Sequence, residues 1–207
     1  MTYMEIILTQ VRKTDLDRIV GGYITFDKSD IISSHFLRRS PIQDKQSVVE
    51  MAYSDIESLN GYFQDARTCN IFLKKLLIGM EMKDVFIWIG CDGEDCDIEL
   101  SFLEEQFHSM QNSELKCNLQ KLIQRLMQFY DDFQIGDIIL GYEPAQDEDM
   151  KVLEIKKGQV MCFNEHIHRS SAAQVLYELA KEIRKNWSTV LDIEKSINGY
   201  TESESVL

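Results

Sequence analysis

Hydrophobic residues that alternate with polar ones predict strands in the first quarter of the chain. We expect strands at Tyr3–Val11, Gly22–Phe26 and Ser47–Tyr53. The segment between the last two contains Pro41, which disfavours helix at Ser40 and predicts an irregular connection there.

A different spacing follows. Apolar residues at intervals of three and four favour a helix over about Asp65–Met80, with an apolar stripe of Cys69, Phe72, Leu73, Leu76, Leu77 and Met80. The continuous apolar run Val85–Ile89 then predicts a strand that is buried on both faces.

The clearest local pattern is a hairpin in the middle of the chain. Asp92–Asp95 contains Gly93 and predicts a turn. The return strand alternates strictly, so that one set of side chains points inward (Cys96, Ile98, Leu100, Phe102) and the other outward (Asp97, Glu99, Ser101). This alternation places carboxylates on the solvent face and at the tip of the hairpin.

The second half of the chain predicts further helices and strands. We expect helix over Leu103–Phe133, broken near Gln111–Ser113, with a core stripe of Leu115, Leu119, Leu122, Leu126, Phe129 and Phe133. A strand at Gly136–Tyr142 and a hairpin of Met150–Ile155 with Gln159–Phe163 follow. The last helix begins near Ser170 and Ser171 and runs to Trp187.

These elements predict an α+β fold with a largely antiparallel sheet and about three helices packed on it. No repeat and no linker rich in Pro, Gly or Ser divides the 207 residues. We therefore expect a single domain over residues 1–198 and a disordered polar tail over residues 199–207.

Charge changes this picture because it is segregated. The net charge is −13, and residues 84–150 account for all of it, with 16 acidic residues against Lys116, Lys121 and Arg125. Such a field repels nucleic acid and anionic membranes and attracts basic partners. Acidic residues also keep proteins in solution, but solubility alone does not require that the segments on either side, residues 1–83 and 151–207, have no net charge.

Cysteine use and hydropathy predict a cytoplasmic protein. Five cysteines are an odd number without the spacing of a disulfide framework, which fits a reducing compartment. Cys91 and Cys96 bracket the hairpin turn, and we expect them to be small core thiols rather than a disulfide. No stretch approaches 18 consecutive apolar residues, and no signal peptide or lipid anchor pattern is found.

Motifs for catalysis are missing. The chain has no Gly-x-Ser-x-Gly elbow, no Walker loop and no Gly-x-Gly-x-x-Gly, so we expect no cofactor and favour a protein that is not an enzyme. The alternative rests on His166 and His168, with Cys162 or Glu165 as a further ligand, because zinc favours N and S donors. No distant segment offers a further ligand, and surface histidines explain the pair more simply.

In its size, its acidity and its lack of catalytic motifs, the chain resembles bacterial immunity proteins that act against secreted nuclease-type toxins. The resemblance implies a non-catalytic protein that neutralises a basic partner by occluding its active site. The alternatives are a metal-dependent enzyme centred on His166 and His168, or an oligomeric scaffold. We expect the partner-binding residues to be Asp92, Glu94, Asp95, Asp97, Glu99, Glu104, Glu105, Tyr142, Glu143, Asp147, Glu148 and Asp149.

Overall fold

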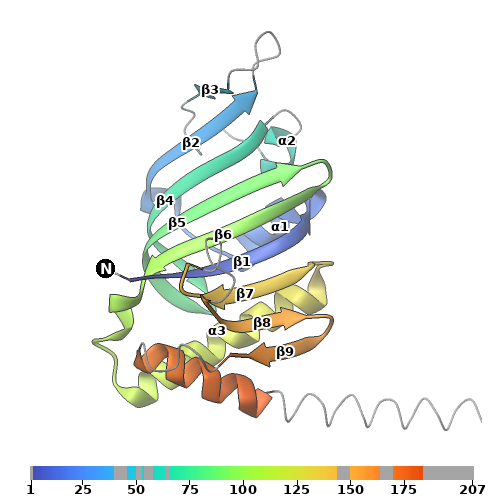
Figure 1. Cartoon of the computed structure of the whole chain (residues 1–207). Coiled ribbons are helices and arrows are strands. Elements are labelled where there is room, and N and C mark those ends of the chain that lie inside the picture. The colour runs from blue at the N-terminus through green and yellow to red at the C-terminus, as the bar shows by residue number, and fades with distance from the viewer. Residues whose placement is uncertain are drawn as a thin grey trace, which may run out of the picture.

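A single antiparallel sheet organises the protein. The computed structural model describes residues 2–39, 46–49, 53, 58–63, 66–143, 150–163 and 170–183. Within these residues nine strands form one sheet in the order β3-β2-β4-β5-β6-β1-β7-β8-β9 (Figure 1). The strands are β1 (Tyr3–Arg12), β2 (Ile31–Arg39), β3 (Gln46–Val49), β4 (Ala66–Ile78), β5 (Met80–Asp92), β6 (Asp95–Leu103), β7 (Asp137–Gly141), β8 (Lys151–Lys156) and β9 (Gln159–Cys162).

Helices cover one face of this sheet. The longest is α3 (Asn112–Asp132), and residues 171–183 are also helical. Shorter helical segments are η1 (Lys13–Asp15), α1 (Leu16–Arg18), η2 (Ile19–Tyr23), η3 (Lys28–Asp30), α2 (Leu59–Tyr62) and η5 (Glu104–Phe107). In Figure 1, α1 and α3 lie behind the strands. We call the side that they cover the inner face, and the side toward the viewer the outer face.

The core lies on the inner face. The stripe predicted for α3 is buried in full, and it packs with alternate residues of the central strands such as Ile6, Ile87 and Ile98. The α+β class, the antiparallel sheet and the strands β1, β5, β6, β7, β8 and β9 confirm the prediction. The break before α3 also lies where the sequence predicted it.

The helix predicted over Asp65–Met80 is wrong, because this segment is strand β4. Residues Cys69, Ile71 and Leu73 are buried in strict alternation, then Lys74 and Lys75 are both exposed, and burial resumes at Leu76 and Ile78. The buried positions thus change from odd to even residue numbers at Lys74 and Lys75. A single change of this kind inside a strand produces intervals of two and three between buried residues, which resemble a helical stripe. Strand β5 makes the matching shift at Lys83 and Asp84, where Asp84 adopts a left-handed φ of 49°.

Two further predictions near the N-terminus are wrong. Gly22–Phe26 forms no strand, since the chain turns through η2, where Gly21 has φ 116°, and pairs only through isolated bridges at Ile24 and Thr25. The predicted connection contains strand β2 instead. Its sequence gives a weak strand signal, because Ser33, Ser34 and His35 stand where a buried strand would carry apolar residues.

The expected burial of Val85–Ile89 on both faces is only half correct. Val85, Ile87 and Ile89 are fully buried on the inner face, whereas Phe86 and Trp88 are half-buried on the outer face. The prediction of free thiols at the hairpin is also wrong. Cys91 and Cys96 are register partners, and a disulfide joins them, with 4.0 Å between their Cα atoms.

Some predictions lie outside the described residues. The last helix is described from residue 171 to residue 183, so its predicted end at Trp187 is not covered. The tail at residues 199–207, the histidines His166 and His168, and the acidic residues Asp147, Glu148 and Asp149 lie outside as well.

Candidate functional site

The predicted binding residues separate into two groups at opposite ends of strand β6. Asp92, Glu94, Asp95 and Asp97 are exposed at the end of the β5–β6 hairpin. The residues from Glu104 onward follow the other end of β6, which is nine residues long and therefore spans roughly 30 Å. The structure thus brings together the hairpin carboxylates and not the full predicted set.

Register places the hairpin carboxylates on the outer face. Trp88 pairs with Glu99, Gly90 pairs with Asp97, and Asp92 pairs with Asp95. Because cross-strand partners point to the same side of a sheet, these carboxylates form a line that ends at the hairpin turn. We call Asp92, Asp95, Asp97 and Glu99 the acidic row. Neither β6 nor the part of β5 from Asp84 onward contains a Lys or Arg residue.

Hydrogen bonds hold two members of the acidic row in place. The backbone N–H of Gln10 donates to Asp97 Oδ1 at 2.9 Å, and it reaches it because β1 bulges there, with Gln10 at φ 54°. The Ser101 hydroxyl donates to Glu99 Oε1 at 2.9 Å. These side chains lose less rotational freedom when a cationic group binds to them.

A hollow of about 660 Å³ lies beside the row and brings in residues that the sequence did not single out. It is lined by Asp95 from the hairpin, by Arg12, and by the end of α3 and the residues after it, including Asp131 and Asp132. Asp132 accepts a hydrogen bond from the Tyr23 hydroxyl, which raises the pKa of Tyr23. The sequence signal that could have indicated them is the stretch of residues 126–150, which contains no Lys or Arg and includes both aspartates.

Arg12 and Lys13 reduce the negative charge at this end. Arg12 is the register partner of Asp95, and its guanidinium donates to the Gln134 side chain. The backbone N–H of Lys13 donates to the Glu94 carbonyl at 2.9 Å. The hairpin end therefore carries two cations among its carboxylates, while the part of the row nearer Trp88 has none on its own two strands.

Two residues predicted to lie on the binding surface are buried in the protein. Glu104 is 5% exposed and Tyr142 is 2% exposed. The Tyr142 hydroxyl donates to Glu104 Oε1 at 2.6 Å and lies 2.7 Å from the Ser170 hydroxyl. Their surface placement was therefore wrong, because the pair connects η5 to β7 and to the start of the last helix. Glu105 is exposed, and Glu143 is half-buried at φ 51°.

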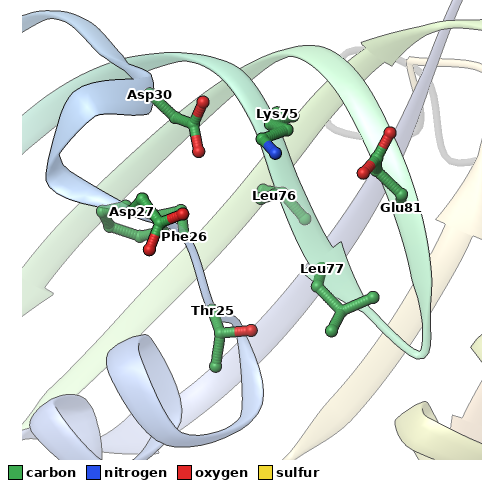
Figure 2. Close-up of a pocket in the computed structure, with 8 residues that line it drawn as sticks. All are labelled: Thr25, Phe26, Asp27, Asp30, Lys75, Leu76, Leu77 and Glu81. Carbon is green, nitrogen blue, oxygen red and sulfur yellow. The ribbon is translucent and has the colours of Figure 1, made fainter.

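A second hollow, of about 290 Å³, lies at the edge of β4 (Figure 2). It forms because residues 26–30 span the gap between two pairings, Thr25 with Leu77 and Ile31 with Leu73, which only three residues of β4 separate. Its charged lining is Asp27, Asp30, Lys75 and Glu81. None of the predicted site residues that the structure describes lies there.

Two kinds of feature are absent from the described part of the chain. Within it, no group of three or more His, Cys, Asp or Glu side chains is arranged to hold a metal ion. Likewise, no described helix has the length and hydropathy needed to cross a membrane.

Comparison with known proteins gives the family. Residues 2–158 match the model of the PABL017 Cdi1I immunity protein family. The chain belongs to this family. It is therefore an immunity protein, as its resemblance to bacterial immunity proteins in size, acidity and lack of catalytic motifs implied.

Other comparisons add little. No curated protein matches this immunity protein. Among solved structures it is similar to a chain of the 1.75 Å crystal structure of the toxic C-terminal tip of CdiA from Pseudomonas aeruginosa in complex with immune protein. The two chains are 14% identical with a TM-score of 0.49, and the match covers 74% of this chain and 94% of the other.

Proposed function

We propose that this immunity protein neutralises a cognate toxin without catalysis, by docking the acidic row against a basic surface of the toxin and occluding its active site. The observation that carries the proposal is the row itself, in which four carboxylates share one face of two strand segments that contain no Lys or Arg, with Arg12 of β1 as the one cation paired to the row, at Asp95. Asp131 and Asp132 extend the negative surface across the hollow.

The physical role of the row is to accelerate association and to select the partner. Toxins that cleave or bind polyanions need basic clefts, and carboxylates on a fixed strand can occupy the positions of the phosphates. Complementary charge of this kind raises association rates by about 10- to 1,000-fold at low salt. The hydrogen bonds to Asp97 and Glu99 keep the carboxylates ordered before the toxin arrives.

Charge reversal tests the proposal. The variant Asp92→Lys, Glu94→Lys, Asp95→Lys leaves the Gln10–Asp97 hydrogen bond intact and changes three exposed side chains. With a toxin domain whose growth inhibition the wild-type chain relieves on co-expression, stopped-flow association at low salt should slow by about tenfold or more. The difference from wild type should shrink as salt is added, because the Debye length falls to about 3 Å at 1 M.

A matched variant controls for total charge. Glu81→Lys, Glu114→Lys, Glu178→Lys makes the same change in net charge at exposed positions away from the acidic row. It should associate at close to the wild-type rate. Equal slowing by both variants would show that only net charge matters, and an unchanged rate in the row variant would overturn the proposal.

We also propose that the protein acts in the cytoplasm. Cys69, Cys117 and Cys162 are free thiols, which supports a reducing compartment, whereas the Cys91–Cys96 disulfide is the observation against it. Acid-quenched alkylation of intact cells, followed by mass spectrometry, measures whether Cys91 and Cys96 are reduced or oxidised in vivo. A reduced Cys91–Cys96 pair in vivo supports the cytoplasm, and a fully oxidised pair contradicts it.

A further inference from the structure

Aromatic side chains lie on the same outer face as the acidic row. Phe72 of β4 is the register partner of Phe86 on β5, and their ring centroids are 4.7 Å apart. Phe72 is 40% exposed, although it belongs to one of the most apolar residue types. On β2 the pairing register shifts between Ile31, the partner of Leu73, and Ser33, the partner of Phe72. The extra residue between them, Ile32, is 59% exposed.

Trp88 continues this apolar surface toward the carboxylates. It lies two residues from Phe86 on the same face of β5 and is the register partner of Glu99. Its indole lies over Gly90, since a Cβ built on Gly90 would come within 2.3 Å of the ring. The tryptophan is therefore held at the boundary between the aromatic residues and the acidic row.

We infer that Ile32, Phe72, Phe86 and Trp88 form an apolar anchor for the toxin, and that the acidic row forms one edge of the same docking surface. This inference rests on the proposed function and adds the part of the interface that provides affinity. Binding energy at interfaces concentrates in a few aromatic or arginine side chains within a ring of polar contacts, and complementary charge contributes more to the association rate.

Charge identifies a basic toxin, rather than a second copy of this chain, as the occupant. In Figure 1 no helix lies in front of β4, β5 and β6, so this face of the described structure is uncovered. Two copies meeting through it would bring their acidic rows close together, and like charges across an interface disfavour association. A partner with an apolar centre and basic surroundings matches both parts of the surface.

Two exposed residues of one strand provide a matched test. Phe72→Ser removes part of the proposed anchor, whereas Leu77→Ser removes a 49% exposed leucine that lies five residues further along β4, where it lines the hollow of Figure 2. Binding to the toxin domain is measured by surface plasmon resonance in low salt and in 0.5 M NaCl. Ile32→Ser serves as a second anchor variant, and thermal melts show whether each variant folds.

Phe72→Ser and Ile32→Ser should each raise the dissociation rate, Phe72→Ser by about tenfold or more, at both salt concentrations and with little change in association rate. Leu77→Ser should dissociate like wild type. If both folded anchor variants dissociate like wild type, the inference is wrong even where charge reversal slows association. If the anchor variants weaken binding while charge reversal changes nothing, the charge proposal fails and the anchor stands. Loss of a homodimer with unchanged toxin binding would assign the face to a second copy and overturn the inference.

Discussion

Replacing Gly90 with alanine gives a test of how Trp88 is held. In the interior of a strand, glycine is less stable than alanine by about 0.5–1 kcal/mol, so Gly90→Ala alone should stabilise the fold. The structure reverses this expectation. The new methyl group would lie 2.3 Å from Cη2 and 2.5 Å from Cζ2 of Trp88, so the indole must move by about 1 Å or more.

The size of the effect follows from what the indole loses. A side chain forced about 30° from its rotamer costs about 0.5–1.5 kcal/mol. Every 40 Å² of apolar surface returned to water adds about 1 kcal/mol. These two costs together exceed the gain from removing a glycine. We therefore expect Gly90→Ala to lower the free energy of unfolding by about 1 kcal/mol. The fold should survive, because the atoms that must move belong to a half-buried side chain and not to the backbone.

Urea denaturation and tryptophan fluorescence measure both consequences. In a Trp187→Phe background the emission reports on Trp88, because the sequence contains only two tryptophans. Gly90→Ala should shift this emission to longer wavelength and raise the dissociation rate of the toxin. Gly22→Ala is the control, since apart from its two chain neighbours no described residue has an atom within 4 Å of a Cβ built on Gly22. A Gly90→Ala protein that is more stable than wild type, with unchanged emission, would refute the reasoning.

Two further predictions concern the interior. Tyr142→Phe removes the hydroxyl that donates to buried Glu104 and contacts Ser170, so it should lower the free energy of unfolding by about 1.5–3 kcal/mol in urea denaturation. Toxin affinity should not change. A loss of affinity without a loss of stability would place Tyr142 at the interface. Burial raises the pKa of the Cys69 thiol to about 12, so at pH 8 iodoacetamide should modify exposed Cys117 and leave Cys69 intact in the folded protein, as mass spectrometry can show, and fast labelling of Cys69 would contradict its burial.

The sequence predicted the hairpin and α3 because each has a single unbroken period. Residues Cys96 to Phe102 alternate without a fault, and Leu115 to Phe133 keep the helical interval throughout. Strand β4 was predicted wrongly because its inward side changes parity at Lys74 and Lys75. This change of the inward-facing positions cannot be recognised from β4 alone. It is compatible with a strand only because β5 makes the matching change at Asp84, which keeps the two strands paired.

The candidate site was predictable in charge and not in shape. Segregated acidic residues indicated the hairpin, and alternation placed Asp97 and Glu99 on its outward side. Whether Glu104 lies at the surface depends on Tyr142, which is 38 residues distant and donates a hydrogen bond to it. The apolar anchor could not be predicted from the sequence either, because Phe72 and Phe86 are register partners only if both segments are strands.

Carboxyl footprinting of the complex tests the central claim most directly. Carbodiimide labelling of exposed carboxylates, quantified by mass spectrometry, compares this immunity protein alone with the same protein bound to its toxin domain. We predict that the toxin protects Asp92, Asp95 and Asp97, while Glu81, Glu114 and Glu178 are labelled equally in both samples. Equal labelling of the acidic row with and without toxin, or protection confined to the other three residues, would contradict the account.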